Sequence, residues 1–437
     1  MTRHLQVILY ERVIGTLTQG NGGQHTFSYA DPNTATPLSL SMPPRTQPYP
    51  HAIVEPFLEG LLPESDDVRI TLGEQFGVSS RNPFALLEHL GLDCAGAVQF
   101  CTDEQVDDVL VGNGSLEPVE PSIGARLRTL RTNPASWVAD REHWSLAGAQ
   151  SKFALRWTSG GAWRQATGAE PTSHIFKPGV QEFMNQALIE HICLTAARAL
   201  GLRAAESAYK VWDGEPAIVV TRYDRLPLPQ GGLRRVHQED ICQALSVYPR
   251  DKYESQGGPS AADVIWLLRR SGDRATRDEN VTRFTDGLLY NYLIGAPDAH
   301  AKNYSILLLG DIVRLAPLYD VASGLAYERR HRPGMGEAAM SIGGERHFGR
   351  VERRHLEAFA VATSQDAASL VDRTRELAAA IPDAMADALD DSDVREYTAE
   401  LPERLLTPLA SLCATTIRQL DSPASRDERR SGRSHEL

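Results

Sequence analysis

The chain has 437 residues, of which 42% are hydrophobic and 23% charged, so it is long enough for about two or three domains and is globular rather than disordered in composition. Its formal net charge of −12 argues against a broad surface for nucleic-acid phosphates, although a local basic patch remains open. No apolar run reaches the roughly 18 residues that span a bilayer. The chain begins without a signal-peptide pattern, and its scattered cysteines form no Cys-x-x-Cys pair. We therefore expect a cytoplasmic protein with reduced thiols and no membrane partner.

Residues 1–105 are predicted to form a separate α/β subdomain, because short alternating strands are followed by helical stretches. The stretch that follows is rich in Asp, Glu, Pro and Gly, which favours a linker over residues 106–125. The strands of the subdomain are expected at Leu5–Tyr10 and Val13–Leu17, and its helices at Ile53–Leu61 and Pro83–Leu90.

Residues 126–235 are predicted to form a small sheet that carries one helix. Alternating apolar residues separated by Gly and Pro turns indicate the strands, and Gly201 ends the helix. The strands are expected at Lys152–Trp157, Ala162–Ala166, His174–Lys177, Ser207–Val211 and Ala217–Tyr223, and the helix at Phe183–Leu200.

Residues 236–421 are predicted to form an all-helical lobe, and the arginine-containing polar tail, 422–437, is predicted to be disordered. A small sheet followed by a helical lobe is the order of a bilobal protein kinase, so we predict an α+β fold of that kind with an added N-terminal subdomain. A nucleotide would bind in the cleft between the lobes. The main helices are expected at Ala261–Arg270, Val281–Ile294, Arg354–Thr363 and Ala367–Ala380.

The segment DAHAKN (298–303), followed by Asp320, carries the clearest chemical signal. In protein kinases an Asp precedes an Asn by five residues in the catalytic loop, and a later Asp binds the metal ion. We therefore predict that Asp298 orients the acceptor hydroxyl while Asn303 and Asp320 bind Mg²⁺. Asp and Asn are also common in turns, which is the alternative for this pair.

A predicted hairpin between Asn303 and Asp320 supports the first reading. Residues 304–309 and 312–316 have strand patterns, and the Gly-Asp pair between them suits a tight turn. Such a hairpin would return Asp320 to the side of Asn303.

Three further features fit a phosphate site, each with an ordinary structural alternative. Lys177 ends the third strand of the small sheet, where a kinase lysine contacts the α- and β-phosphates, and Glu190 is one acid that could pair with it. The loop SLAGAQSK (145–152) has small residues that allow backbone N–H groups to approach phosphates. His300 could orient groups or act as a base. A solvated strand end, a plain loop and a structural histidine are the alternatives.

Together these segments resemble the HipA family of bacterial toxin kinases, and the similarity extends over nearly the whole chain. Two departures concern Ile189, which precedes Glu190 where relatives often have Asn, and Ala299, where Gly is usual. The strings that carry the resemblance are LLPESDDVR (61–69), FALLEHLGLDCAGAVQF (84–100), SLAGAQSK (145–152), HIFKPG (174–179), TRYDR (221–225), HQEDICQ (237–243), KYESQGGPS (252–260), LIGAPDAHAKNYS (293–305) and LAPLYDVAS (315–323).

The resemblance implies a serine/threonine-protein kinase that uses ATP and Mg²⁺ and arrests growth, with persistence, by phosphorylating an aminoacyl-tRNA synthetase, the glutamate enzyme above all. It implies that Asp298 is the catalytic residue, that Asn303 and Asp320 bind the metal ion, and that Ser145 is autophosphorylated. The residues implied around ATP are Ala147, Gly148, Ala149, Gln150, Ser151, Lys152, Lys177, Thr221, Arg222, Tyr223, Gln238, His300 and Tyr319.

The resemblance also implies a helix-turn-helix antitoxin of the HipB type, through which the kinase would reach operator DNA. Two other functions stay open from the residues alone. One is a catalytically silent co-repressor with a kinase fold, and the other is a phosphotransferase for a small molecule. Transfer of phosphate from a nucleotide to a protein would separate the kinase from both.

Overall fold

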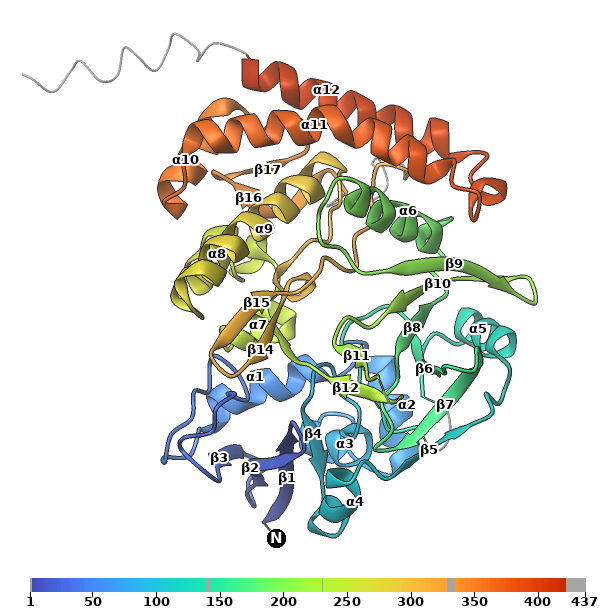
Figure 1. The fold of residues 1–437 in the computed structure, drawn as a ribbon, viewed down its shortest axis with the longest axis vertical. Helices are drawn as coiled ribbons and strands as arrows, with labels where there is room; N and C mark the ends of the chain where they lie inside the picture. Colours follow the sequence, from blue (N-terminus) through green and yellow to red (C-terminus); the bar gives the residue numbers. More distant parts are fainter. Residues whose placement is uncertain (1, 139–141, 230, 328–334, 422–437) are drawn as a thin grey trace, which may run out of the picture.

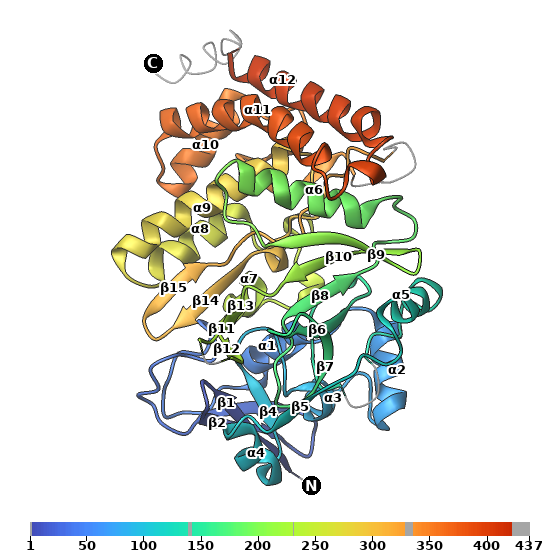
Figure 2. The ribbon, with the colours of Figure 1, turned by 45° about the vertical axis from the view of Figure 1, so that its right-hand side comes forward.

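The computed structural model describes residues 2–138, 142–229, 231–327 and 335–421. The predicted tail, 422–437, lies outside the described residues. Figures 1 and 2 show the N-terminal residues at one end of the molecule, the C-terminal helices at the other end, and sheet between them. This arrangement confirms the predicted α+β class. Among the described residues no helix combines the length and the apolar character needed to cross a bilayer.

The N-terminal residues form a four-stranded antiparallel sheet in the order β3-β2-β1-β4, with three helices beside it. Alternate residues of the first strand, including Leu5 and Val7, are buried in one core with Phe57 and Phe84 from the helices. The predicted strands and helices of this region are confirmed. The elements are β1 (Arg3–Leu9), β2 (Arg12–Gln19), β3 (His25–Tyr29), α1 (His51–Leu61), α2 (Asp66–Phe76), α3 (Pro83–Leu90) and β4 (Gln99–Cys101).

The segment predicted as a linker, 106–125, carries secondary structure. It contains α4 (Val106–Leu110) and β5 (Gly114–Glu117), and α5 (Ile123–Thr132) begins at its end. β5 pairs with a strand of the next sheet, so this segment contributes an edge strand to the following region. The limits of the domains themselves stay a prediction.

The next sheet has six strands in the order β5-β7-β6-β8-β10-β9. All five strands predicted for it are confirmed, and β5 is added at its edge. The helix α6, which contacts β9 and β10, begins later than predicted because Asn185 takes a left-handed φ of 65° just before it. The elements are β6 (Phe153–Trp157), β7 (Trp163–Gly168), β8 (His174–Lys177), α6 (Gln186–Ala199), β9 (Ser207–Trp212) and β10 (Glu215–Thr221).

The region predicted as all-helical is helical in bulk but also contains strands, which corrects that prediction. The predicted hairpin is confirmed, with Gly310 at a φ of 59° in its turn. A third strand pairs with the hairpin from far away in the sequence, a partner that no local pattern reveals. The strands after β10 are β11 (Arg225–Pro227), β12 (Leu233–Arg235), β13 (His237–Asp240), β14 (Ser305–Leu309), β15 (Ile312–Leu315), β16 (Glu337–Ile342) and β17 (Glu345–His347).

The C-terminal helices share one core with α6, which lies against α11 (Ala367–Leu389). Figure 1 shows the longest of them layered over α6 at the end of the molecule opposite the N-terminus. The helix predicted at Val281–Ile294 starts earlier than predicted, at Arg274, because Asp273 caps it. The remaining helices are α7 (Ile241–Ala244), α8 (Ala261–Arg270), α9 (Arg274–Leu293), α10 (Arg353–Thr363) and α12 (Thr407–Asp421), the last of which falls outside the predicted elements.

A buried ion cluster joins the N-terminal subdomain to the chain that leaves β10. Asp93 accepts contacts from Arg222, Arg225 and Arg235 at 3.2, 2.8 and 3.3 Å, and Asp224 contacts the first two arginines. Burial alone would raise the pKa of Asp93, but the three guanidinium groups hold that pKa well below its usual range. The subdomain is therefore fixed to the sheet by charge as well as by apolar packing.

We predict that Asp93→Asn lowers the free energy of unfolding by about 3–5 kcal/mol, because it leaves buried guanidinium groups without their shared carboxylate. Since the native pKa of Asp93 is depressed, its stabilising effect is present at neutral pH and fades as the pH falls through the acid range. Urea denaturation at pH 7 measures the change. Asp372→Asn is the control, because that side chain is 77% exposed, and its effect should stay within about 0.5 kcal/mol. Equal stability of the two variants would contradict the prediction.

Candidate active site

A cavity of about 870 Å³ lies where the six-stranded sheet faces the helical region. The N-terminal subdomain, the region of the six-stranded sheet and the helical region all contribute residues to its lining. Gly60 and Glu64 come from the N-terminal subdomain. Ser145 and Ser151 are the predicted site residues that do not line it. The predicted residues that do are Ala147, Gly148, Ala149, Gln150, Lys152, Lys177, Thr221, Arg222, Tyr223, Gln238, Asp298, His300, Asn303, Tyr319 and Asp320.

Lys177, at the end of β8, connects the two lobes across this cavity. Its Nζ lies 2.8 Å from Oε1 of Glu190 on α6 and 2.8 Å from Oδ1 of Asp320. Burial alone would lower the pKa of Lys177, but the two carboxylates raise it above its usual value. Burial likewise favours a raised pKa for Asp320, yet Lys177 and Lys152 lower it to about 2. The site therefore holds an ionised acid beside a protonated lysine, and the pairing with Glu190 is confirmed.

The Asp298–Asn303 loop and the hairpin after it bring the predicted metal ligands, Asn303 and Asp320, to the same cavity. Nδ2 of Asn303 donates to the backbone carbonyl of Asp298 at 2.7 Å, which leaves the amide oxygen available as a ligand. The hairpin of β14 and β15 then returns the chain to Asp320, which follows β15 and has a left-handed φ of 58°. Asp298, Asn303 and Asp320 therefore all line one cavity, and their roles toward the acceptor and the metal ion stay a prediction.

His300 sits in this loop as a neutral group. Burial and the nearby Lys252 lower the pKa of His300 to about 3, so the ring carries no charge near neutral pH. Its Nε2 lies 3.8 Å from Oδ1 of Asp298, and its buried Nδ1 has no hydrogen-bond partner among the described residues. Although 65% of the Asp298 side chain is exposed, the protein groups that surround it in the cavity raise its pKa by displacing water. Asp298 is thus the better candidate for a base.

The loop before β6 has the features of a phosphate cradle. Gly148 has a φ of 101°, and a Cβ there would come within 2.8 Å of Nζ of Lys152. Nζ of Lys152 donates to the carbonyl of Ala147 at 2.5 Å and so closes the loop on itself. Burial and the nearby Lys177 lower the pKa of Lys152 to about 8, so the amine is still mostly protonated at pH 7.

Two serines of the same loop face away from the cavity. The hydroxyl of Ser145 donates to the carbonyl of Leu61 at 2.8 Å, and the residue is only 1% exposed. The hydroxyl of Ser151 donates to the carbonyl of Pro134 at 2.9 Å. The structure thus ties the start of the loop to the end of α1.

The chain after β10 forms the opposite wall with β13. Tyr223 donates its hydroxyl to the side-chain oxygen of Gln238, and its ring lies 5.8 Å from that of Tyr319. The guanidinium of Arg222 is paired with Asp93 and Asp224 in the buried ion cluster. Arg222 therefore holds this wall in position and does not offer its charge to a ligand. An apolar and aromatic wall of this kind suits a flat ring such as adenine.

The sequence argument missed three residues of the cavity. Glu64 and Lys252 form an ion pair at 2.6 Å, and the hydroxyl of Tyr253 donates to Oδ1 of Asp298 at 2.5 Å. Their only signals in the sequence are two strings whose roles no spacing rule assigns, LLPESDDVR (61–69) for Glu64 and KYESQGGPS (252–260) for Lys252 and Tyr253.

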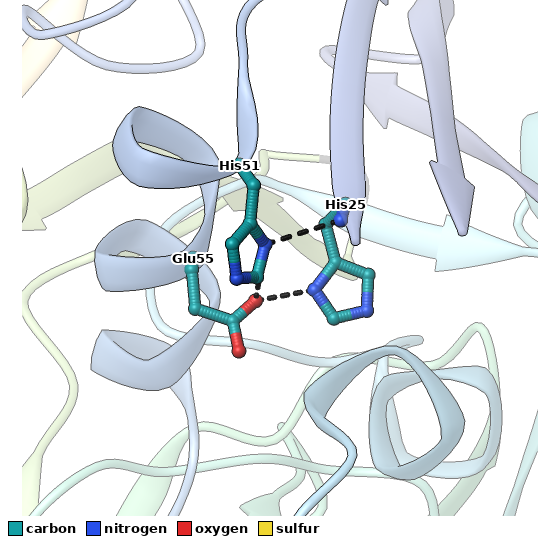
Figure 3. Close-up of side chains that lie close together, drawn as sticks. All are labelled: His25, His51 and Glu55. Carbon is teal, nitrogen blue, oxygen red and sulfur yellow. Dashed lines mark hydrogen bonds and ion pairs between the residues drawn. The ribbon is translucent and has the colours of Figure 1, made fainter. Parts of the chain in front are cut away.

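A second group with metal-ligand chemistry lies outside the cavity, where β3 meets α1 (Figure 3). Ligand atoms of His25, His51 and Glu55 lie within 4.8 Å of one another. Glu55 accepts from the ring of His25, and the backbone N–H of His25 donates to Nδ1 of His51 at 3.1 Å. The amide of Gln19 donates to the other ring nitrogen of His25 and to Asn82, which caps α3. Hydrogen bonds therefore account for these ligand atoms, and the group ties β3 to α1.

Comparison with known proteins gives one consistent result. Residues 5–101 match the model of the HipA N-terminal domain, and residues 144–389 match that of the HipA-like C-terminal domain. The chain is 38% identical over 326 residues to the putative kinase Y4mE of Sinorhizobium fredii, covering 72% of this chain and 76% of that protein. It is 28% identical over 373 residues to the serine/threonine-protein kinase toxin HipA of Shewanella oneidensis, covering 80% and 82%.

Among solved structures, the chain resembles HipA in the complex of Shewanella oneidensis HipA and HipB with operator DNA. The TM-score is 0.80 at 25% identity, and the alignment covers 95% of this chain and 98% of the other.

We predict that Lys177→Met lowers the free energy of unfolding by about 3–5 kcal/mol, because Glu190 is fully buried and loses its cation. Burial raises the pKa of Glu190, so a carboxyl left without its cation is protonated more readily at pH 5 than at pH 8, and the loss should be smaller at pH 5. Urea denaturation at both pH values measures this. The double variant Lys177→Met/Glu190→Gln should regain most of the stability, and a single variant as stable as the wild type would refute the prediction.

Proposed function

The chain belongs to the HipA family of serine/threonine-protein kinases, and on that basis we propose that it is a toxin that transfers the γ-phosphate of ATP to a protein of the translation apparatus. The observation that best supports this is the single cavity lined by Lys177, Asp298, Asn303 and Asp320. A lysine, two acids and an amide are the groups with which kinases position and neutralise a triphosphate.

The side chains that these residues contribute to the cavity fit Mg²⁺ and a triphosphate. Asp320 is ionised and Asn303 keeps its amide oxygen for a ligand, and both are the hard oxygen donors that Mg²⁺ prefers. When bound, Mg²⁺ would neutralise charge on the β- and γ-phosphates. Lys177 would hold the neighbouring phosphate oxygens, and the absence of a side chain at Gly148 would let the loop backbone approach them.

Asp298 would act on the acceptor. Its carboxylate would receive the proton of a serine or threonine hydroxyl as that oxygen bonds to the γ-phosphorus and the bond to the β-phosphate oxygen breaks. A raised pKa suits this role, because a base nearer neutrality takes the proton more readily. Most of the remaining rate would come from positioning and charge stabilisation.

For the biological target we propose an aminoacyl-tRNA synthetase, with the glutamate enzyme favoured, so that phosphorylation arrests growth in the cytoplasm and leads to persistence. We also propose that a helix-turn-helix antitoxin of the HipB type neutralises the kinase and carries it to operator DNA. The similarity to HipA in a solved HipA, HipB and operator DNA complex supports this partner.

We further propose that phosphorylation of Ser145 inactivates the kinase. The buried hydroxyl at this position leaves no room for a phosphate, whose charge would also repel the phosphates of ATP. A modified loop would therefore have to leave its place beside α1.

We expect Asp298→Asn to lower kcat for protein phosphorylation by a factor on the order of 10²–10⁴, because the amide cannot take the acceptor proton. The assay uses purified protein, γ-labelled ATP, Mg²⁺ and a ribosome-free lysate, and labelled proteins are then identified. Asp311→Asn is the matched control, since Asp311 is exposed in the hairpin turn, and it should keep full activity. A folded Asp298→Asn protein with wild-type activity would contradict the assignment of Asp298 as the base. If only small molecules are labelled, a small-molecule phosphotransferase is favoured over a protein kinase.

We expect mass spectrometry to find phosphate on Ser145 after incubation of the wild type with ATP, and not in Asp298→Asn. The modified protein should be inactive and its loop, 146–151, should be cut faster by protease, because the bond to Leu61 is gone. Ser145→Ala should stay active for longer. A fully active protein that carries phosphate at Ser145 would contradict self-inhibition.

A further inference from the structure

The hydroxyl of Tyr253 lies against the acid assigned to the acceptor. It donates to Oδ1 of Asp298 at 2.5 Å, across 45 residues of sequence. The side chain of Asp298 is 65% exposed to solvent, so without this contact little would restrain the rotation of its carboxylate. The segment of Tyr253 has no part in the mechanism described above.

The residues on either side of Tyr253 in the sequence are both hydrogen-bonded to other parts of the fold. The carbonyl of Lys252 accepts from the backbone N–H of Ala301, in the catalytic loop, at 3.4 Å. On the other side, the carboxylate of Glu254 accepts from the backbone and the hydroxyl of Ser341 at 2.5 and 2.6 Å. The segment is therefore anchored to the loop and to β16.

The ring of Tyr253 is also fixed. It meets the ring of His300 edge to face, with centroids 4.9 Å apart and planes at 86°. His300 is 3% exposed, so this contact joins the tyrosine to a buried part of the catalytic loop. A hydroxyl on a ring held in this way stays in one position relative to Asp298.

We propose that Tyr253 is a positioning residue for Asp298: by occupying Oδ1, it turns the carboxylate so that the second oxygen receives the acceptor hydroxyl. A carboxylate has two oxygens that accept hydrogen bonds, so one can be anchored while the other reacts. This inference rests on the proposed role of Asp298. It concerns the protein acceptor and not the nucleotide, because Tyr253 contacts the acid rather than Lys177, Asn303 or Asp320.

The test is Tyr253→Phe, which keeps the ring and its contact with His300 but removes the donor. We expect kcat for protein phosphorylation to fall on the order of 10- to 100-fold, the range for a hydrogen bond to a charged group. The KM for ATP should change by less than about 2-fold, because only transition-state positioning is lost. Tyr248→Phe is the matched control, since Tyr248 is in the preceding turn and does not line the cavity, and it should behave as wild type.

A double variant separates positioning from a general structural effect. In an Asp298→Ala background there is no carboxylate to orient, so Tyr253→Phe should cause no further loss. An unchanged or increased kcat in Tyr253→Phe, or equal losses in both backgrounds, would overturn the proposal. If Asp298→Ala is itself fully active, the proposed role of Asp298 as the base is contradicted as well. If Asp298→Ala is inactive and Tyr253→Phe is normal, only the role of Tyr253 falls.

Discussion

The arrangement of the site depends on the two ion pairs of Lys177. One pair is to Glu190 on the helix that covers the sheet, and the other is to Asp320 beyond the hairpin of the opposite lobe. Carboxylate partners offset the cost of burying the ammonium of Lys177, so its charge favours an arrangement in which the strand, the helix and the hairpin meet at one point. The same contacts set the charge states of the cavity, since they keep Asp320 ionised and Lys177 protonated.

The N-terminal subdomain also supports the cavity. The end of α1 accepts the hydroxyl of Ser145, and the backbone N–H of Glu64 donates to the carbonyl of Gly148 at 3.0 Å. On the other wall, Asp93 gathers the arginines that follow β10. The subdomain thus supports both the phosphate loop and the wall near Tyr223, which a kinase with only two lobes would have to stabilise by other means.

Sequence patterns predicted the parts of this site that depend on local order. The Asp298–Asn303 spacing and the hairpin to Asp320 are read within a short stretch, because turn chemistry and strand alternation are local properties. Tyr253 and Asp93 could not be found in this way. Each acts on a partner far away in the sequence, and a tyrosine or an aspartate has the same local signal whether it faces solvent or a reacting group. The pairing of β13 with the hairpin and the edge position of β5 were missed for the same reason, since they are fixed by long-range register.

The lysines of the cavity explain how a chain with a net charge of −12 could hold a triphosphate. Lys177 and Lys252 are already matched with carboxylates, so they shape the site more than they add charge to it. Lys152 instead donates to a carbonyl of its own loop. A phosphate would replace that neutral acceptor with an anion, which adds the attraction of opposite charges to the bond that the protonated amine donates. Nucleotide binding would therefore tighten the loop around Lys152, whereas a phosphate on Ser145 would pull the start of the same loop from its bond to Leu61. In the proposed function the two events would act on one element in opposite directions, so that a single loop would both hold the substrate and end the activity.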